Sequence, residues 1–418
     1  MDKGKAYEVS LLKLLVATEF PPDAPGGGPA VVRQMLRGFP GNVDWWSARR
    51  SSRVVFQSTQ VWESGAVSVA QRFHAPLGFF SHRRCCSRLR GLLMQYGWSQ
   101  FAAASLRSAL VQSRPDSIWL IPHEWAIFPL HCIFSRLNQS SLNVPIHVTL
   151  QDFPDSQQRQ RLLGVEVTRK MASLQKTLYQ FATTCDATSL PMLQELQRRT
   201  GRLGEQMLHA GLENEDFYFL EKTVPDLSLR PSLRIAYAGT IVVEEEFKAF
   251  IQILETLRYS FSSRLELCFW SAHSYRGRPW FNPSWMKELG HLPEHDLRIA
   301  LRDLDWGFIP MSTNDDDPRY NRFSFPTKFI TYLAAGLPIL SFGHPESSLM
   351  KLTCPYQLGA RFFSKDEMRA KMTTNFLQNP LMKRLVRPEI VRCSRDWFDA
   401  CRTRSQLWRS AGWLTRQA

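Results

Sequence analysis

The segment formed by residues 303–352 constrains the fold most, because it reads as a strand, a loop, a helix and a second strand. Its first apolar run, at 306–311, shows no alternation of polar and apolar residues, which is typical of a parallel strand buried on both faces. After a polar loop, apolar residues recur at the spacing of a helix of about three turns that ends at Gly336. A second strand follows at 339–342. The pattern predicts a βαβ unit, and such units bind ligands at the carboxyl ends of their strands.

The amino end of this helix is a candidate anion site. Backbone N–H groups without intrahelical partners point outward there, and the helix dipole adds partial positive charge. Pro326 suits a first helical turn, and Lys328 comes two residues later. We expect the anion to be a phosphate, with Lys328 as a candidate contact. The alternative is a lysine on a solvated helix face.

Length and charge narrow the class of protein. A chain of 418 residues exceeds what one hydrophobic core usually supports, so two domains are expected. The net charge of +14 favours anionic partners such as nucleotide phosphates, anionic lipids or nucleic acid. The eight cysteines show no zinc-binding spacing and read as reduced thiols of a cytoplasmic protein. No signal-peptide pattern and no apolar run of about 20 residues, the length that spans a bilayer, occurs in the sequence.

The first half of the chain alternates strands and helices in the same way. Residues 11–17 predict a strand, and the loop after it carries Gly26, Gly27 and Gly28 before a helix at 30–36. Successive glycines allow positive φ and a close approach of backbone to ligand. We therefore interpret this loop as part of a binding site rather than as a flexible linker.

Two later strands of the first half end in polar residues. His123 follows the strand at 116–121, and Asp152 follows the strand at 146–150. Because the carboxyl ends of parallel strands meet at one edge of the sheet, both side chains are candidate ligand contacts. The alternatives are a structural histidine and, for Asp152, a cap of the following helix.

Together these features resemble the GT-B glycosyltransferases related to the retaining family-four enzymes. The specific match lies in residues 325–328 and 332–338, which resemble the donor-binding helix of that family. The resemblance implies an α/β fold with two Rossmann-like domains facing a cleft, at residues 1–222 and 232–395. It also implies a terminal helix at 396–418 that packs back on the first domain.

The resemblance further implies a donor site in the second domain and an acceptor or sugar site in the first. The implied donor contacts are Gly239, Thr240, Arg278, Leu292, Phe325, Pro326, Thr327, Lys328 and Thr331. The implied acceptor or sugar contacts are Gly27, Gly28 and Asp152, and the implied catalytic residues are His123 and Lys328. No metal and no cofactor is expected, since GT-B enzymes generally neutralise the leaving phosphate with helix termini and basic side chains.

The sequence departs from the family at both of its paired glutamates, whose positions hold Phe323 and Thr331. A hydroxyl at Thr331 can hydrogen-bond a ribose, although more weakly than a carboxylate. Glu244, followed by two further glutamates, stands near the place where many relatives carry a lysine, so Arg278 is a candidate for the missing positive charge. We interpret Asp315 and the two aspartates after it as a solvated loop rather than a magnesium site.

We therefore expect a glycosyltransferase that moves a sugar from a UDP- or GDP-linked donor to a hydroxyl of a glycan or lipid-linked acceptor. Transfer with retention, in polysaccharide or glycolipid synthesis, is the expectation from the resemblance. The basic segment at 82–90 indicates contact with the anionic inner face of the cytoplasmic membrane, or else a solvated helix start. A catalytically silent GT-B protein that binds a nucleotide or a partner is the second hypothesis. Nucleic acid is not expected, because no helix-turn-helix, RNP or zinc-finger pattern occurs.

Overall fold

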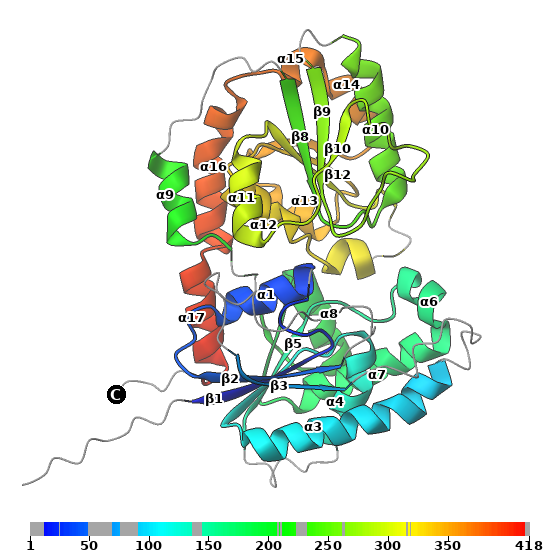
Figure 1. The fold of residues 1–418 in the computed structure, drawn as a ribbon, viewed down its shortest axis with the longest axis vertical. Helices are drawn as coiled ribbons and strands as arrows, with labels where there is room; N and C mark the ends of the chain where they lie inside the picture. The colour runs from blue at the N-terminus through cyan, green and yellow to red at the C-terminus, as the bar shows by residue number, and fades with distance from the viewer. Residues whose placement is uncertain are drawn as a thin grey trace, which may run out of the picture.

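Two α/β domains lie one above the other, and helices join them along one side (Figure 1). The computed structural model describes residues 12–24, 26–48, 69–75, 91–135, 144–206, 209, 211–222, 232–260, 264–314, 317 and 319–413. The basic segment at 82–90 lies outside these residues.

The first domain is built on a parallel sheet that has seven strands within the described residues, in the order β3-β2-β1-β4-β5-β6-β7. Its strands are β1 (Lys13–Thr18), β2 (Asn42–Ala48), β3 (Val69–Ala75), β4 (Ser117–Leu120), β5 (Ile146–Leu150), β6 (Thr184–Ala187) and β7 (Glu205–Gln206). Its helical segments are α1 (Gly27–Leu36), η2 (Leu93–Trp98), α3 (Ser99–Ser113), η3 (Glu124–Ala126), α4 (Ile127–Phe134), α6 (Gln157–Leu163), α7 (Val165–Phe181) and α8 (Leu190–Thr200).

The second domain has a parallel sheet of six described strands in the order β10-β9-β8-β11-β12-β13. Its strands are β8 (Ser232–Ala238), β9 (Arg264–Trp270), β10 (Met286–Glu288), β11 (Trp306–Pro310), β12 (Ile339–Phe342) and β13 (Gly359–Phe362). Its helical segments are α10 (Glu244–Arg258), α11 (Glu294–Arg302), η4 (Arg319–Phe323), α12 (Lys328–Ala334), α13 (Ser348–Thr353), α14 (Lys365–Lys371), α15 (Thr374–Leu377) and α16 (Met382–Trp397).

Both sheets follow the Rossmann strand order, in which the direction of winding reverses between two central strands. The reversal falls between β1 and β4 in the first domain and between β8 and β11 in the second. The central strands are buried along their length, β4 and β12 completely, because helices cover both faces. The expected architecture of two Rossmann-like domains is confirmed, and each reversal point opens a crevice at the carboxyl edge of its sheet.

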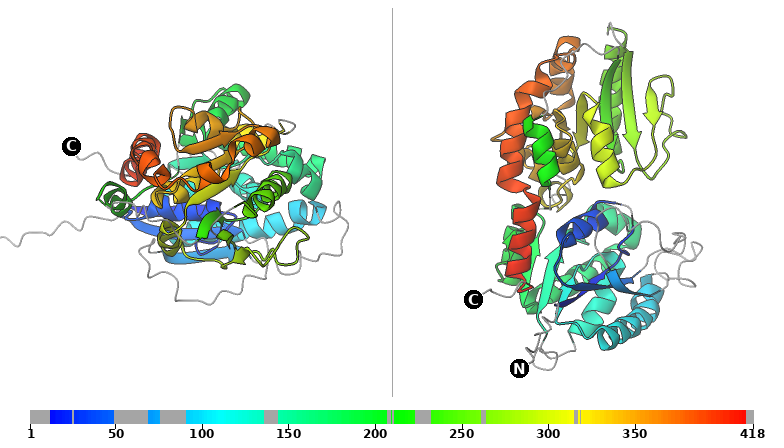
Figure 2. Two further views of the ribbon diagram at one scale, coloured as in Figure 1. Left: turned by 90° about the horizontal axis from the view of Figure 1, so that it is seen from above. Right: turned by 60° about the vertical axis from the view of Figure 1, so that its left-hand side comes forward.

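Two chain segments cross between the domains in opposite directions. Helix α9 (Asn214–Lys222) leaves the first domain and packs against α12 and α16 of the second. Helix α17 (Ala400–Ser410) continues from α16 and packs against α1 of the first (Figure 2). Where the segments pass, Leu212 and Asp399 form a parallel β-bridge. A side chain at Gly211 would collide with the Phe398 carbonyl oxygen, so this crossing requires glycine.

The returning helix is anchored to the first domain by specific polar contacts. Arg404 donates to both carboxylate oxygens of Glu213, at 2.7 and 2.9 Å. Farther along, the indole N–H of Trp408 donates to the Met35 carbonyl and that of Trp413 to the Ser117 hydroxyl, both at 2.9 Å. The helix expected to cross back from the second domain is thus confirmed.

Helix α12 is shorter than its apolar spacing predicts. It has seven residues, about two turns, and it ends as expected before Gly336, whose φ is +69°. Phe325 precedes the helix, and its ring packs against the rings of Phe329 and Phe398, each with centroids 5.7 Å apart. The apolar spacing therefore counted Phe325 as helical, although it is buried at the hinge, where the segments around Leu212 and Asp399 cross. Among the described residues, no helix combines the length and the apolar character needed to cross a bilayer.

The pair formed by Arg404 and Glu213 generates a stability prediction. Burial raises the pKa of Glu213, but the hydrogen bonds and charge of Arg404 outweigh it and hold that pKa below its usual value. Replacing Arg404 with Ala leaves the carboxylate half-buried without its partner, and we expect a loss of about 3 kcal/mol in the free energy of unfolding. Arg409→Ala, at an exposed site on the same helix, should change it by less than about 0.5 kcal/mol. Urea unfolding followed by circular dichroism measures both.

The pH dependence of this difference follows from the sign of the shift. A carboxylate with a lowered pKa stabilises the fold above the ordinary glutamate pKa, and the contribution is lost as the pH falls through the lowered value. The gap between wild type and Arg404→Ala should therefore be full at pH 7 and close in acid. A gap that stays constant down to pH 3 would mean that the ion pair does not cause it.

Candidate functional site

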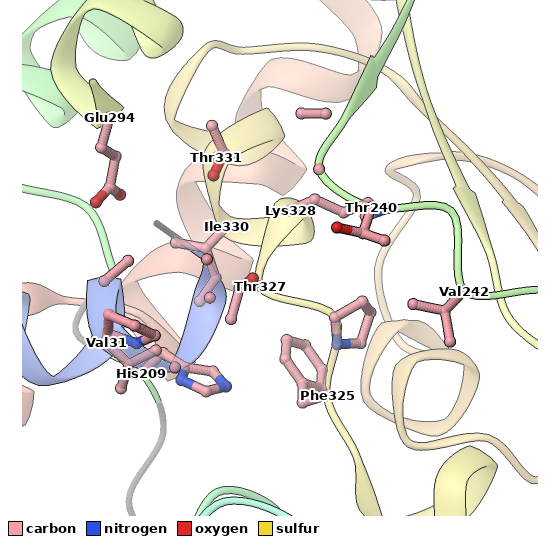
Figure 3. A pocket seen from close by; sticks show the side chains of 18 of the residues that line it. Val31, His209, Thr240, Val242, Glu294, Phe325, Thr327, Lys328, Ile330 and Thr331 are labelled. Atoms are coloured by element: carbon pink, nitrogen blue, oxygen red, sulfur yellow. The ribbon is translucent and has the colours of Figure 1, made fainter. Parts of the chain in front are cut away.

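A cleft of about 600 Å³ lies where the carboxyl edges of the two sheets face each other. Figure 3 shows that side chains of both domains point into it. The sequence-predicted residues that line it are Gly27, Gly28, His123, Asp152, Gly239, Thr240, Leu292, Phe325, Pro326, Thr327, Lys328 and Thr331. The structure therefore brings together candidates that are about 300 residues apart in sequence, as the resemblance to two domains facing a cleft implies.

Arg278 is the predicted donor contact that does not line this cleft. Its side chain is more than half exposed, and its guanidinium lies 3.9 Å from the Glu244 carboxylate. Glu244 also accepts a hydrogen bond from the Trp280 indole at 3.0 Å, and Glu246 accepts one from the backbone N–H of Thr313 at 2.8 Å. Neither carboxylate lines the cleft, and both are held by these other partners.

Tyr332 positions the helix that carries Lys328. The Tyr332 hydroxyl accepts a hydrogen bond from the Ala238 N–H, at 2.8 Å, where β8 ends. The ring lies flat on β11, because a Cβ at Gly307 would be only 2.5 Å from it. Helix α12 is thereby fixed over the reversal point of the sheet, and its amino end faces the loop after β8.

Lys328 is a cation without a counterion in the part of the chain that the structure describes. Its ammonium lies 3.9 Å from the centroid of the Tyr237 ring, and Figure 3 shows its side chain reaching toward Thr240. Burial lowers the pKa of Lys328 to about 7, and no charged group opposes this effect. An anion in the cleft would stabilise the protonated form, so this position favours a negatively charged ligand.

The glycine-rich loop meets α12 across the cleft. A Cβ at Gly27 would lie 2.6 Å from the Thr327 hydroxyl oxygen, and one at Gly28 would lie 2.9 Å from the Gln151 side-chain oxygen. A side chain at Gly27 would require Thr327 to shift, so this glycine allows the first turn of α1 to approach the second domain, while Gly28 leaves room for Gln151 of its own domain. The amino ends of two helices, α1 and α12, therefore face the same space.

His123 is held by a network of charged groups on the first domain. Its Nδ1 lies 2.6 Å from a Glu19 oxygen, and its Nε2 lies 3.0 Å from an Arg159 nitrogen and 3.8 Å from an Asp152 oxygen. Burial and Arg159 oppose protonation, but Glu19 and Glu124 outweigh them, and the pKa of His123 is raised. A protonated ring would turn an N–H toward Arg159, so Arg159 has to move before His123 can donate from Nε2.

The same network contains the residues that could hold a metal ion. Glu19, His123 and Glu124 place three possible ligand atoms within 4.8 Å of one another. However, Arg159 contacts both His123 Nε2 and Glu124, the latter at 2.6 Å. A guanidinium at this position repels a metal ion, so these residues fit an ion-pair network better than a metal centre. Asp315 and Asp316, the other carboxylates considered for a metal, lie outside the described residues.

Phe323, which replaces the first family glutamate, does not line the cleft. Its ring packs edge-on against Phe153 of the first domain, with centroids 5.1 Å apart, and its carbonyl accepts a hydrogen bond from Ser189 at 2.7 Å. The next residue, Ser324, donates to Asp152 at 2.6 Å. The segment where a carboxylate is expected therefore joins the two domains instead. Asp152 does not cap the following helix, whose N-cap is Ser156.

Sequence reasoning missed three polar residues of the site. Glu19, the first residue after β1, orients His123, and its position at the carboxyl edge is the signal that could have identified it. Gln151 and His209 line the cleft with buried polar atoms that have no hydrogen-bond partner within the described residues. Their sequence signal is weak, because only the packing around them shows that they lack partners.

Comparisons with known proteins support the fold. No protein-family model matches the sequence, and a search of curated proteins found no match. The chain is similar in structure to sucrose-phosphate synthase from Thermosynechococcus elongatus, with a TM-score of 0.66 and 11% identity over 97% of this chain and 100% of that one. It is also similar to Anabaena HepE in complex with UDP and glucose, with a TM-score of 0.59 and 12% identity over 96% and 100%.

A third similar structure, from Listeria monocytogenes, is described as a UDP-N-acetylglucosamine 2-epimerase, with a TM-score of 0.57 and 8% identity over 96% of this chain and 95% of that one. The likeness to these proteins over nearly the whole chain confirms the GT-B fold expected from the sequence. At such low identities the likeness extends to the fold alone.

The uncompensated charge of Lys328 predicts a gain of stability when it is removed. An unfolded lysine has a pKa of about 10.4, whereas Lys328 has one of about 7, so the unfolded chain binds the proton more tightly between these values. Wild-type stability then rises with pH across that window. Lys328→Met should melt at a higher temperature than wild type at pH 6.5, and the advantage should shrink as the pH approaches 9.5.

Thermal unfolding followed by circular dichroism measures this effect. Lys351→Met is the matched control, because Lys351 is half-exposed and paired with Glu346. Its melting temperature should stay near that of wild type at both pH values. A lower melting temperature for Lys328→Met at pH 6.5 would show that the ammonium is stabilised where it lies.

Proposed function

We propose that this protein is a glycosyltransferase that binds a nucleotide-sugar donor in the cleft between its domains. The observation that carries the proposal is the Lys328 ammonium, which lies over the Tyr237 ring at the amino end of α12 and lines the cleft without a counterion among the described residues. A diphosphate is the anion that fits such a place, because its oxygens can accept from the ammonium and from backbone N–H groups together. The structural likeness to HepE in complex with UDP and glucose supports this choice of ligand.

We assign the parts of the donor from the chemistry of the lining. Lys328 with the hydroxyls of Thr240 and Thr327 would bind the diphosphate. Thr331, one turn farther along α12, would hydrogen-bond the ribose, and Leu292 lies in the loop that would hold the base. The sugar would then lie toward the first domain. UDP and GDP donors fit this assignment equally well.

Transfer with retention is the mechanism that we propose. The acceptor oxygen would attack the sugar carbon on the face from which the phosphate leaves, while the departing phosphate oxygen takes the acceptor proton. One carbon–oxygen bond breaks, one forms, and the nucleoside diphosphate leaves with the proton. The protein would supply positioning and positive charge, with Lys328 stabilising the leaving group and His123, held by Glu19, contacting the sugar or acceptor.

A binding protein of the same fold without activity is the second candidate. The observation that favours it is Phe323, whose ring is used to join the domains where the resembling family carries a glutamate. Such a protein would still bind the nucleotide through Lys328 and Thr331, because these contacts do not depend on turnover.

A membrane contact would give the protein access to a lipid-linked acceptor. Near the start of the helical segment that includes η2 and α3, Leu92, Leu93 and Tyr96 are exposed, Tyr96 by 65%. These apolar side chains directly follow the basic segment at 82–90 in sequence. A basic run beside exposed apolar residues fits an anionic membrane surface, which would bring the cleft near a lipid-linked acceptor at the cytoplasmic face. Synthesis of a polysaccharide or glycolipid would follow.

Donor turnover tests the proposed activity. Release of UDP or GDP from a panel of nucleotide sugars, with and without glycan acceptors, should identify one donor that wild type consumes. Lys328→Ala should lower kcat by about 100-fold, as expected for loss of a group that stabilises the leaving charge, and Thr331→Ala by about 5-fold, as expected for one neutral hydrogen bond. Lys351→Ala should leave turnover unchanged.

The outcomes separate the candidates. Unchanged turnover in Lys328→Ala and Thr331→Ala would refute this site. Binding of UDP or GDP without any turnover in wild type would favour the inactive protein.

Vesicle sedimentation tests the membrane contact. Wild type should bind vesicles that contain about 30% anionic lipid and should be released by high salt, because the attraction is partly electrostatic. Leu93→Glu combined with Tyr96→Glu should weaken binding about 10-fold, since two apolar contacts become charged. Tyr259→Glu, at an exposed site on the second domain, is the control. Equal binding to neutral and anionic vesicles would contradict the proposal.

A further inference from the structure

His209 is a buried polar side chain that faces the cleft without a partner. Its exposed fraction is 4%, and neither ring nitrogen has a hydrogen-bond partner among the residues that the structure describes. The residue lines the cleft close to the hinge. A buried polar group without a partner destabilises the protein, so such a group at a cleft wall indicates a ligand that completes its hydrogen bonds.

The surroundings of His209 keep its ring neutral. The ring lies beside that of Phe325, with centroids 5.9 Å apart and planes inclined by 35°. Burial lowers the pKa of His209 to about 4, and the nearby Asp152 only partly opposes this. A neutral imidazole offers one N–H donor and one nitrogen acceptor. A ligand that satisfies both ring nitrogens must therefore offer an acceptor and a donor.

Gln151 provides a second unpaired group in the same cleft. Its side-chain nitrogen is buried and lacks a hydrogen-bond partner within the described ranges. The end of β5 that carries it is fixed, because Thr188 donates to the Gln151 carbonyl at 3.2 Å and Gln175 donates to the next carbonyl, that of Asp152, at 3.1 Å. The amide, like the imidazole, can donate and accept at once.

The positions of His209 and Gln151 in the cleft indicate which part of the ligand they contact. In the view of Figure 3, His209 lies below Thr327, on the side away from Lys328. Gln151 lies against Gly28 of the glycine-rich loop. The Asp152 carboxylate, the charge that acts on His209, would repel a second phosphate, and an apolar group would leave both side chains unpaired. Hydroxyl groups match both side chains, because each hydroxyl donates and accepts.

We propose that His209 and Gln151 bind hydroxyl groups of the transferred sugar and so select for the sugar part of the donor. This inference rests on the proposed function, in which Lys328 binds the diphosphate next to that sugar. His209 is then a residue that determines substrate specificity. Its lack of a partner in the free protein is a stability cost that the bound sugar removes.

Calorimetric titration with and without the sugar tests this inference. The probes are UDP against UDP-glucose and GDP against GDP-mannose, with wild type, His209→Phe and Gln151→Leu. Both variants keep the side-chain volume approximately and lose the hydrogen bonds. The relevant pair is the one that wild type binds. We expect its nucleotide sugar to bind each variant about 10-fold more weakly than wild type, while the affinity for its free nucleoside diphosphate stays within about 2-fold of wild type. His295→Phe, on the exposed face of α11, should change neither affinity.

Two further measurements separate recognition from a structural role. His209→Phe without ligand should melt at the same or a higher temperature than wild type, since it removes an unpaired buried group. His209→Gln, which keeps one donor and one acceptor, should recover part of the affinity for the sugar-bearing ligand. Equal losses in the two His209 variants would show that shape matters rather than hydrogen bonding, and would overturn the inference.

The outcomes also separate this inference from the proposed function. If wild type binds the diphosphates and nucleotide sugars but the His209 and Gln151 variants bind them equally well, only the inference fails. An equal loss for free diphosphate and nucleotide sugar would also overturn it. If wild type binds neither pair, the proposed donor site itself fails, and the inference fails with it.

Discussion

The crossing of two chain segments at the hinge determines how the two sheets face each other. The β-bridge between Leu212 and Asp399 holds the segments together, and the ion pair between Arg404 and Glu213 follows within a few residues. A further hydrogen bond joins the domains across the cleft, from Gln34 of α1 to Glu294 of α11. These contacts fix the distance at which the glycine-rich loop meets α12, and they thereby determine the width of the cleft.

Several groups in the cleft lower the stability of the free protein and would be stabilised by a bound ligand. Lys328 is desolvated without a counterion, and His209 and Gln151 bury polar atoms without partners in the described parts of the chain. Elsewhere some neutral polar atoms, such as the Trp98 indole nitrogen, also lack partners within the described residues, but buried charges such as Arg298 are paired, here with Asp216 and Glu294. Such a contrast is expected where selection acts on a ligand rather than on the fold, because each uncompensated group becomes stabilised only when the ligand arrives.

Much of this arrangement could be predicted from the sequence. The unbroken apolar runs that end in polar or glycine residues identified the central strands and the edge where the cleft opens. The carboxyl-edge rule then placed His123 and Asp152 together, because it depends only on strand direction, whereas the place of Lys328 across the cleft followed from the resemblance to a two-domain fold. Local patterns were sufficient for these predictions, since parallel strands carry their own signature of burial.

Other features depend on contacts between distant residues, and local patterns could not reveal them. Arg278 was a reasonable source of positive charge, but its partner is Glu244, the residue that stands near the place where many relatives carry a lysine. Phe323 and the extended Phe325 are explained only by the first domain and the hinge that bury them. The lack of a partner at His209 is likewise a property of its whole surroundings, which no motif encodes.

Helices α9 and α17 each pack on the domain to which the neighbouring chain does not belong. A fragment ending after α9 would therefore leave Phe217 and Leu220 uncovered, and a fragment beginning at β8 would leave Leu407 and Trp413 uncovered. The two fragments should thus reassemble when mixed, and two intact chains at high concentration can trade these helices to form a domain-swapped dimer.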